Sequence, residues 1–278
     1  MRRIKIVSDS SSDILELSGA EYSYAPMKII TAEREFVDDG DIDLEEMVRF
    51  FAGYKGRSKT SCPNAGDWLM AFGDADDIIC VTITSALSGS YNSACAAKQI
   101  YESENAGRRV YVVDTLSAGP ENTLIVEKLA EYIREGMSYE DICKNIEEYK
   151  KSTGLIFMLK SLNNFANNGR VSPAVAKIAG VMGICIVGKA SDEGTLEPTH
   201  KCRGEARSLE TLISDLKSFG VSNGRVSIAH AQNEPAALKL KEMILERIGS
   251  VKVDIHKLRG LCSFYAEIGG MLVGFEKE

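Results

Sequence analysis

One segment of the chain, Thr84-Ser85-Ala86-Leu87-Ser88-Gly89-Ser90-Tyr91, combines several groups that bind anions in proteins. It follows the apolar run IICVTI, which is typical of a buried parallel strand, and it opens a predicted helix over Ser90–Glu104. The free N–H groups of the helix start and the hydroxyls of Ser88 and Ser90 would form a cluster of donors. Gly89 would let a ligand oxygen approach the backbone. The alternative is a plain serine cap, and a Walker loop is excluded because no Gly-Lys-Ser/Thr follows.

A second cluster of hydroxyls lies in Ser58-Lys59-Thr60-Ser61-Cys62-Pro63, which its proline and small polar residues predict to be a loop. Thr60 and Ser61 would add donors to an anion site, or the segment is simply a solvated turn. Cys62 would be a nucleophile only with a base or a helix N-terminus to lower the pKa of its thiol. The sequence names no such partner, so a hydrolase that uses Cys62 or a serine is a minor alternative.

Three further residues could take part in chemistry. Asp9 follows the first predicted strand like the nucleophile of an aspartyl-phosphate enzyme, but Ser11 occupies the place of the required second carboxylate. We therefore expect Asp9 to accept hydrogen bonds from loop N–H groups. Arg170 ends an Asn-rich segment, and its guanidinium would grip a phosphate or another protein, or face solvent. His230 closes a predicted strand and is either a donor at the ligand crevice or a structural histidine.

Composition limits the class of protein. The 278 residues carry 33 basic and 40 acidic side chains, a net charge of −7, which argues against nucleic acid as a partner. We expect no transmembrane segment and no signal peptide, because apolar runs of the needed length are absent from the sequence. Neither metal-ligand spacing nor a CxxC pair occurs, which predicts reduced thiols, a cytoplasmic location, no metal and no cofactor. The seven thiols belong to Cys62, Cys80, Cys95, Cys143, Cys185, Cys202 and Cys262.

The predicted elements that must position these residues form an α/β protein of two domains. Short apolar runs alternate with amphipathic helices through residues 1–150, which predicts a Rossmann-like three-layer domain with a parallel sheet that carries the hydroxyl loops. Residues 151–278 predict a smaller two-layer α/β domain, whose C-terminal strand could pack back toward the first. Its apolar segment Ala174–Val187 is either core or, given its small residues, the wall of a ligand channel. Asp192-Glu193-Gly194 predicts a hairpin turn.

Taken together, six motifs resemble those of the DegV family of bacterial fatty-acid-binding proteins, which includes the lipid-carrying subunit of fatty acid kinase. The resemblance covers nearly the whole chain and rests on the order and intervals of the motifs. They are the strand and SDSSSD of Ile4–Asp13, KTSCP of Lys59–Pro63, ITSALSGSYNSA of Ile83–Ala94, VVDTLSAG of Val112–Gly119, NNGRVS of Asn167–Ser172 and the GF ending of Gly274–Phe275.

The resemblance implies that a long-chain fatty acid is held between the two domains and that the chain is a carrier, not an enzyme. The second domain would cover the acyl chain. Arg170 would lie at the surface that engages the ATP-binding subunit of a fatty acid kinase, which phosphorylates the carboxylate. The family's carboxylate-binding hydroxyl loops correspond here to Thr60, Ser61, Ser88, Gly89 and Ser90.

One departure from the family pattern concerns the head group. Relatives commonly carry a histidine near the C-terminus that approaches the carboxylate, and Tyr265 stands at that place here. A phenol can donate a hydrogen bond but brings no positive charge. The alternatives are a substrate-binding subunit of the dihydroxyacetone kinase type, in which His230 would have to capture the ligand, and a regulatory module without a ligand.

Overall fold

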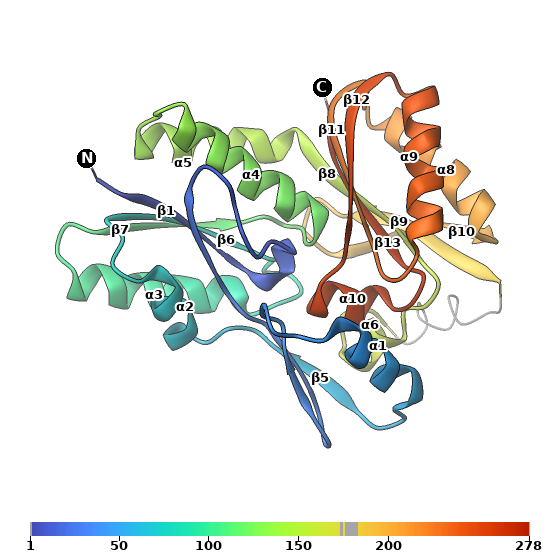
Figure 1. Ribbon diagram of the computed structural model, residues 1–278, viewed down its shortest axis with the longest axis horizontal. Helices are drawn as coiled ribbons and strands as arrows, with labels where there is room; N and C mark the ends of the chain where they lie inside the picture. Colours follow the sequence, from blue (N-terminus) through green and yellow to red (C-terminus); the bar gives the residue numbers. More distant parts are fainter. Residues whose placement is uncertain (1, 173–174, 176–182, 278) are drawn as a thin grey trace.

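The computed structural model describes residues 2–172, 175 and 183–277. These residues form two large β-sheets, one small three-stranded sheet and the helices that pack on them. Figure 1 shows the parallel sheet and the six-stranded sheet side by side, with the small sheet below them. Within the described parts of the chain, no helix has both the length and the apolar composition needed to cross a membrane.

The parallel sheet has the order β2-β1-β6-β7, and all of its strands run in the same direction. Side chains on its two faces pack under different helices: Ile78 and Cys80 pack in one core cluster with α2 and α3, whereas Ile79 and Val81 pack in another with α4 and α5. This burial on both faces is what a continuous apolar strand predicts. The elements are β1 (Ile4–Asp9), β2 (Glu21–Ala25), α2 (Ala65–Phe72), β6 (Asp77–Thr82), α3 (Ser90–Glu104), β7 (Arg109–Asp114), α4 (Pro120–Arg134) and α5 (Tyr139–Lys151).

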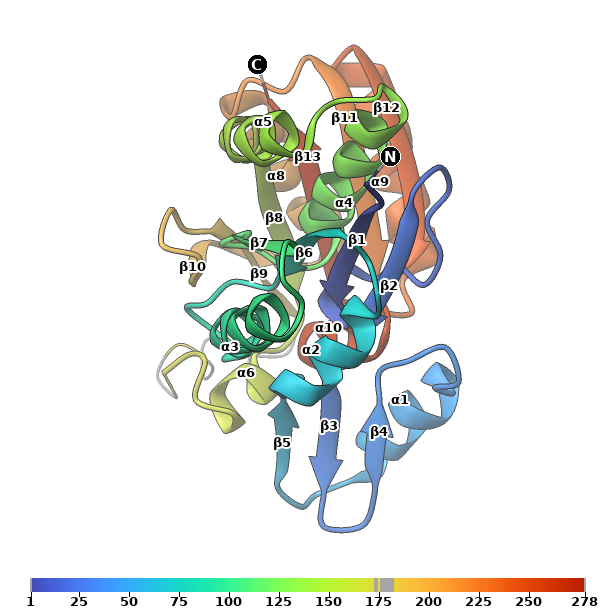
Figure 2. The same ribbon diagram turned by 90° about the vertical axis from the view of Figure 1, so that its left-hand side faces the viewer.

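The small sheet is antiparallel, with the order β4-β3-β5, and it projects from the parallel sheet together with α1 (Figure 2). Its strands are β3 (Lys28–Thr31), β4 (Glu35–Val37) and β5 (Ser58–Ser61), and α1 spans Leu44–Gly53. The prediction of a loop was therefore wrong for residues 58–61. These polar residues form a strand because they pair through the backbone with β3, a segment about thirty residues away.

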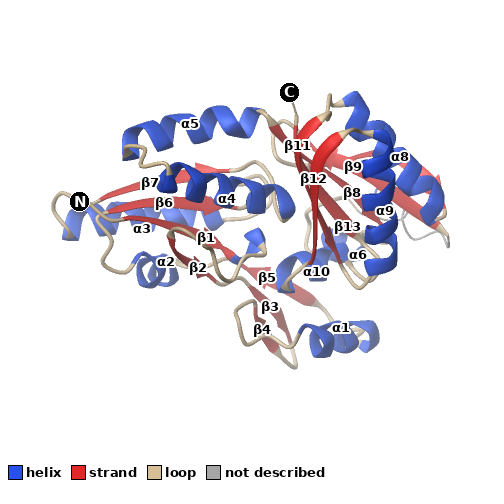
Figure 3. Ribbon diagram, turned by 45° about the horizontal axis from the view of Figure 1, so that its top comes forward, coloured by secondary structure: helices blue, strands red, loops and turns tan. Residues whose placement is uncertain are grey.

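The six-stranded sheet has the order β10-β9-β8-β13-β11-β12 and is antiparallel apart from the parallel pair β11–β12. Helices α8 and α9 cover one of its faces, while α6 and α10 lie on the other side (Figure 3). The elements are β8 (Thr153–Leu159), α6 (Asn163–Asn167), β9 (Ile184–Ala190), β10 (Leu196–Arg203), α8 (Glu205–Ser218), β11 (Asn223–His230), α9 (Glu234–Arg247), β12 (Ser250–Lys257), α10 (Gly260–Ala266) and β13 (Met271–Glu276). A short 3-10 turn, η1, spans Ser10–Ser12.

The predicted fold class is confirmed, and so is the hairpin at Asp192-Glu193-Gly194, which joins β9 to β10. The chain passes from one large sheet to the other between α5 and β8, and a domain boundary at residue 150 stays a prediction. The last strand, β13, lies inside the six-stranded sheet, and α4 packs against it so closely that a Cβ on Gly274 would lie 2.6 Å from the Glu121 nitrogen. The prediction for Ala174–Val187 falls largely on residues outside those described.

Candidate functional site

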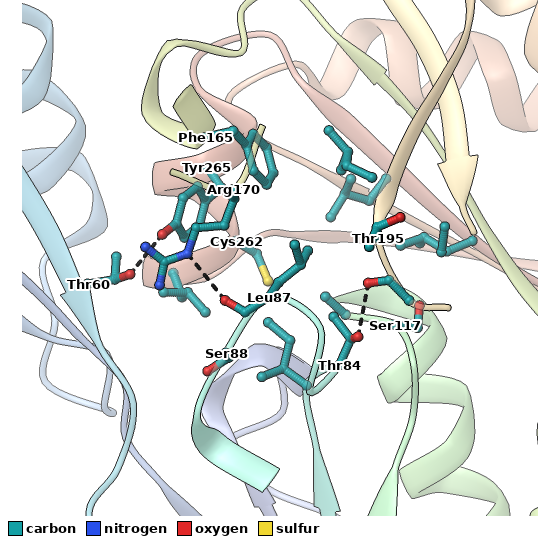
Figure 4. Close-up of a pocket in the computed structure, with 18 of the residues that line it drawn as sticks. Thr60, Thr84, Leu87, Ser88, Ser117, Phe165, Arg170, Thr195, Cys262 and Tyr265 are labelled. Atoms are coloured by element: carbon teal, nitrogen blue, oxygen red, sulfur yellow. Dashed lines mark hydrogen bonds between the residues drawn. The ribbon is translucent and has the colours of Figure 1, made fainter. Parts of the chain in front are cut away.

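A cavity of about 290 Å³ lies between the parallel sheet and the six-stranded sheet. Loops that follow β6 and β7 form one wall, and β8, β13 and α10 form the other. Ligands of open α/β sheets bind at this place, beyond the carboxyl ends of the strands. The lining is mainly apolar. Its polar side carries Thr60, Arg170 and Tyr265, and three further hydroxyl residues, Thr84, Ser117 and Thr195, lie across the cavity (Figure 4).

The apolar wall comes from alternate residues of β8. Leu155, Phe157 and Leu159 line the cavity, joined by Leu272 of β13. Their neighbours on the same strand, such as Ile156, point to the opposite face and pack under α8 and α9. Alternate side chains of this continuous apolar strand therefore face the cavity and the helix-covered core.

Hydroxyl groups form the polar side of the cavity. Thr60, Ser61, Ser88 and Gly89 all line it, so the structure brings together the two hydroxyl loops that lie far apart in the sequence. The Thr60 Oγ1 is 2.7 Å from the hydroxyl of Tyr265, and the two side chains lie at the same side of the cavity in Figure 4. The Ser88 Oγ accepts a hydrogen bond from the backbone N–H of Ser90 at 3.3 Å and can still donate its own proton.

The prediction that the Ser90 hydroxyl binds the ligand disagrees with the structure. Ser90 is fully buried, does not line the cavity, and donates from its Oγ to the Asp9 Oδ2 at 2.6 Å. Asp9 also accepts from the Ile83 N–H at 2.9 Å, which confirms its expected role as an acceptor for loop N–H groups. Burial raises the pKa of Asp9 although hydrogen bonds from Ser11, Ser90 and Ile83 act to lower it. Ser90 and Asp9 therefore hold the loop that presents Ser88.

Tyr265 reaches the polar side from α10, a helix that the sequence pattern did not predict. The carboxylate of Asp38 accepts from the backbone N–H groups of Gly260 and Leu261, at 2.8 and 2.9 Å, and so fixes the start of this helix. Burial raises the pKa of Tyr265, which keeps its phenol protonated and able to donate. The sequence signal for this arrangement is one aspartate of the acidic stretch Asp38–Asp43, which lies more than two hundred residues away.

Arg170 lies at the edge of the same polar side. Its Nε donates to the Leu87 carbonyl at 3.2 Å, and it is half-buried. Of the described residues that line the cavity, it alone carries a charge. Arg170 therefore lies beside the hydroxyl groups of the cavity and does not face solvent alone.

Two residues considered as nucleophiles sit in unreactive surroundings. Cys62 lines the cavity, but burial raises the pKa of its thiol, the opposite of what a nucleophile needs. His230 is buried at the end of β11, where its Nδ1 accepts from the Asn233 N–H at 3.2 Å, and it is not part of the cavity lining. It is therefore placed as a structural histidine, which weakens the dihydroxyacetone kinase alternative.

The fold and the cavity define a two-domain α/β protein with a mainly apolar chamber and a cluster of hydroxyl groups beside Arg170. The sequence profile of the DegV family, described as uncharacterised proteins, matches residues 3–278. A DegV domain-containing protein of Streptococcus pneumoniae is 39% identical over 276 residues, which are 98% of each chain. One from Streptococcus gordonii is 36% identical over 98% of each chain. The chain belongs to the DegV family.

Solved structures similar to this chain carry fatty acids. A DegV family protein from Eubacterium eligens, loaded with heptadecanoic acid, is 43% identical with a TM-score of 0.97, covering 99% of this chain and 100% of its own. The Streptococcus pneumoniae fatty acid kinase (Fak) B3 protein, loaded with linoleic acid, is 38% identical with the same TM-score and coverage. A family member from Ruminococcus gnavus with vaccenic acid is 26% identical, with a TM-score of 0.89 over 98% of this chain and 99% of its own.

Proposed function

We propose that this protein binds a long-chain fatty acid in the cavity between its two large sheets. The observation that carries the proposal is the cavity itself, an apolar chamber in which the hydroxyls of Thr60, Ser61 and Ser88 gather with Arg170 and Tyr265. A fatty acid has the matching chemistry, and each methylene group buried contributes about 0.8 kcal/mol. Heptadecanoic and linoleic acids in two structures of nearly identical fold support the same class of ligand.

The carboxylate would be held by the hydroxyls of Thr60, Ser61 and Ser88 and by the backbone of Gly89, with the Tyr265 phenol close by. Neutral donors suit a buried carboxylate, because hydrogen bonds to an ionised acceptor are short and strong. The Ser90 hydroxyl is left out of this set, since it is already donated to Asp9. Ser90 supports the site through the loop that it anchors.

The direct test is mass spectrometry of an organic extract of the purified protein, followed by fatty-acid binding to the protein stripped of lipid. Absence of both a co-purified lipid and any binding would refute the proposal. Ser88→Ala should weaken binding by about 1–3 kcal/mol, because it removes a hydrogen bond to a charged group. Ser85→Ala is the matched control, since Ser85 is exposed on the same loop and does not line the cavity.

We further propose that the protein is a carrier in the cytoplasm, that it needs no cofactor, and that it presents the fatty acid to the ATP-binding subunit of a fatty acid kinase. The Fak B3 relative supports this proposal by its name, and Arg170 at the cavity edge supports it by its position. With that subunit and ATP, Arg170→Ala should lose acyl-phosphate formation while the lipid stays bound. Loss of the lipid instead would assign Arg170 to the carboxylate site.

A further inference from the structure

The cavity is small for a long-chain fatty acid. An apolar cavity of about 150 Å³ holds one benzene molecule, or about 25 Å³ for each carbon. On that scale the 290 Å³ cavity holds roughly 12 carbons. Heptadecanoic acid, which occupies the Eubacterium eligens relative, has seventeen. A chain of that length needs additional space.

That additional space lies directly behind one wall of the cavity. A solvent-open groove of about 410 Å³ runs between the start of β8, the end of α5 and β9. Leu116, Leu155 and Ala190 line both the cavity and this groove, so they form the partition between them. The partition is placed away from the head group: Figure 4 shows Thr60, Arg170 and Tyr265 on one side of the cavity and Thr84, Ser117 and Thr195 on the other.

The backbone of the partition is held firmly by hydrogen bonds. The Thr84 Oγ1 donates to the Gly194 carbonyl at 2.9 Å, which fastens the β9–β10 hairpin to the loop after β6. A Cβ on Gly194 would lie 3.0 Å from the Leu116 Cα, so the hairpin tip rests on Leu116 itself. The Leu116 N–H donates to the Asp114 Oδ1 at 3.2 Å. These contacts hold the backbone around Leu116, so we look to a side chain for any change in the partition.

Leu116 is the side chain best placed to move. It is 37% exposed, unlike Leu155, which is 8% exposed, so its motion displaces less packing. Its φ of 56° lies in the left-handed region, a strained conformation for leucine that persists where the surrounding structure imposes it. The Leu116 side chain lines both spaces and so forms a plug between them.

The groove beyond the plug can receive an acyl chain. Its lining includes the partly exposed Phe219 and four lysines, Lys150, Lys151, Lys189 and Lys277, together with three acidic residues, Glu121, Glu147 and Asp192. The methylene stems of lysine cover apolar surface while their ammonium groups stay in water. An extended methyl end would therefore pass along the Phe219 ring and the lysine methylene stems.

We propose that Leu116 determines the length of acyl chain that the protein accepts, and that the methyl end of a longer chain displaces it and enters the lysine-lined groove. This inference rests on the proposed function and assigns a specificity residue to the same site. Acids that fit inside the cavity leave Leu116 in place. Longer acids push its side chain toward the groove.

The test is a binding series of saturated fatty acids, from decanoic to icosanoic acid, on the stripped protein. Leu116→Ala should raise the affinity for icosanoic acid relative to dodecanoic acid by about tenfold, the effect of burying about two more methylene groups. Leu116→Trp should change the same ratio in the opposite direction. Leu238→Ala removes a leucine that is 50% exposed on α9 and should leave the ratio as it is.

A second measurement follows the methyl end directly. Icosanoic acid with a diazirine at its terminal carbon is bound, irradiated, and the labelled peptides are identified by mass spectrometry. Labels in the groove, at Lys150 or Lys189, are expected. An unchanged ratio in both Leu116 variants, or labels only around Thr60, would overturn the inference. If no fatty acid of any length binds, the proposed function itself fails, and the two failures are distinct.

Discussion

The two faces of the six-stranded sheet are equally apolar but are used differently. On one face, Ile156 and Met158 pack with residues of α8 and α9 in a closed core. On the other face, Leu155, Phe157 and Leu159 border a cavity that is closed from across the gap by loops of the parallel sheet. The first face stabilises the fold, whereas the second leaves apolar surface available to a ligand.

This difference teaches that burial alone does not distinguish a core from a binding site. Ile156 is 0% exposed and Leu155 is 8% exposed, and both are adjacent on β8. What separates them is the space opposite: helices of the same domain for one, and a chamber with hydroxyl groups at one side for the other. Substitutions on the two faces should therefore affect different properties.

The largest effect on stability is expected on the closed face. Ile156→Ala should lower the free energy of unfolding by about 4 kcal/mol, because the lost methyl groups leave a void among tightly packed neighbours. Binding of fatty acid by the protein that remains folded should be unchanged. Urea denaturation and a binding isotherm measure the two quantities, and a loss of affinity without a loss of stability would break the comparison.

Leu155→Ala makes the same kind of truncation on the cavity face. We expect the free energy of unfolding to fall by about 2 kcal/mol, a smaller loss than for Ile156→Ala. The side chain already borders open space, so the loss is close to the transfer free energy of the removed atoms alone. Affinity for fatty acid should fall as well, since acyl contacts are lost. Equal costs for Leu155→Ala and Ile156→Ala in urea denaturation would mean that the two faces are packed alike.

Ser90→Ala tests the polar support beneath the cavity. Loss of the hydrogen bond to Asp9 should cost about 1.5–3 kcal/mol of stability, the range for bonds to charged groups. Ser93→Ala, one turn further along α3, is the control and should cost much less. An unchanged stability would show that the Asp9–Ser90 bond does not hold the loop.

The cost of Ser90→Ala should also depend on pH. Burial raises the folded-state pKa of Asp9 above its usual 3.8, so its contribution to stability is greatest at low pH and falls as the pH rises through that pKa. Removal of the Ser90 donor raises the pKa further. The variant should therefore lose more stability at neutral pH than at acid pH, where Asp9 is protonated in both proteins, and urea denaturation across this range checks the sign.

The smallest effect is expected for Tyr265→Phe. It removes one neutral hydrogen bond, that between the phenol and Thr60, which contributes about 1 kcal/mol. Affinity for fatty acid should fall modestly, because Thr60 loses the partner that orients it. Calorimetric binding and thermal unfolding measure the two effects. If both stay unchanged, the phenol supports neither the head group nor the fold.

Elements with a strong local pattern could be predicted from the sequence. Helix α3 has the predicted bounds, Ser90–Glu104. Both signals, the polar residues at its start and the helical spacing of its apolar residues, lie within the segment itself. Helix α5 begins after Ser138, whose side chain accepts from the Asp141 N–H, and serine is a residue type that favours this position. The loop of Ser88 also lines the cavity, because the carboxyl ends of parallel strands meet at one edge of a sheet, whereas Thr60 and Ser61 reach it from β5 of the small antiparallel sheet.

The features that were missed depend on pairings between distant residues. Strand β5 has no apolar pattern and forms through pairing with β3, and α10 begins where Asp38 caps it from far away in the chain. The role of Ser90 could not be predicted for the same reason. Its spacing from Ser88 suggests two ligand donors, but Asp9, eighty-one residues earlier, takes its hydroxyl.

The position of β13 has a consequence for the order in which the protein can be built during translation. Residues 271–276 are the last strand in the chain, yet they lie between β8 and β11 in the interior of the six-stranded sheet. The four strands of the parallel sheet are all synthesised by residue 114. A nascent chain can therefore complete its first sheet early, whereas the six-stranded sheet that borders the cavity cannot close until β13, which adds Leu272 to the lining, has been synthesised.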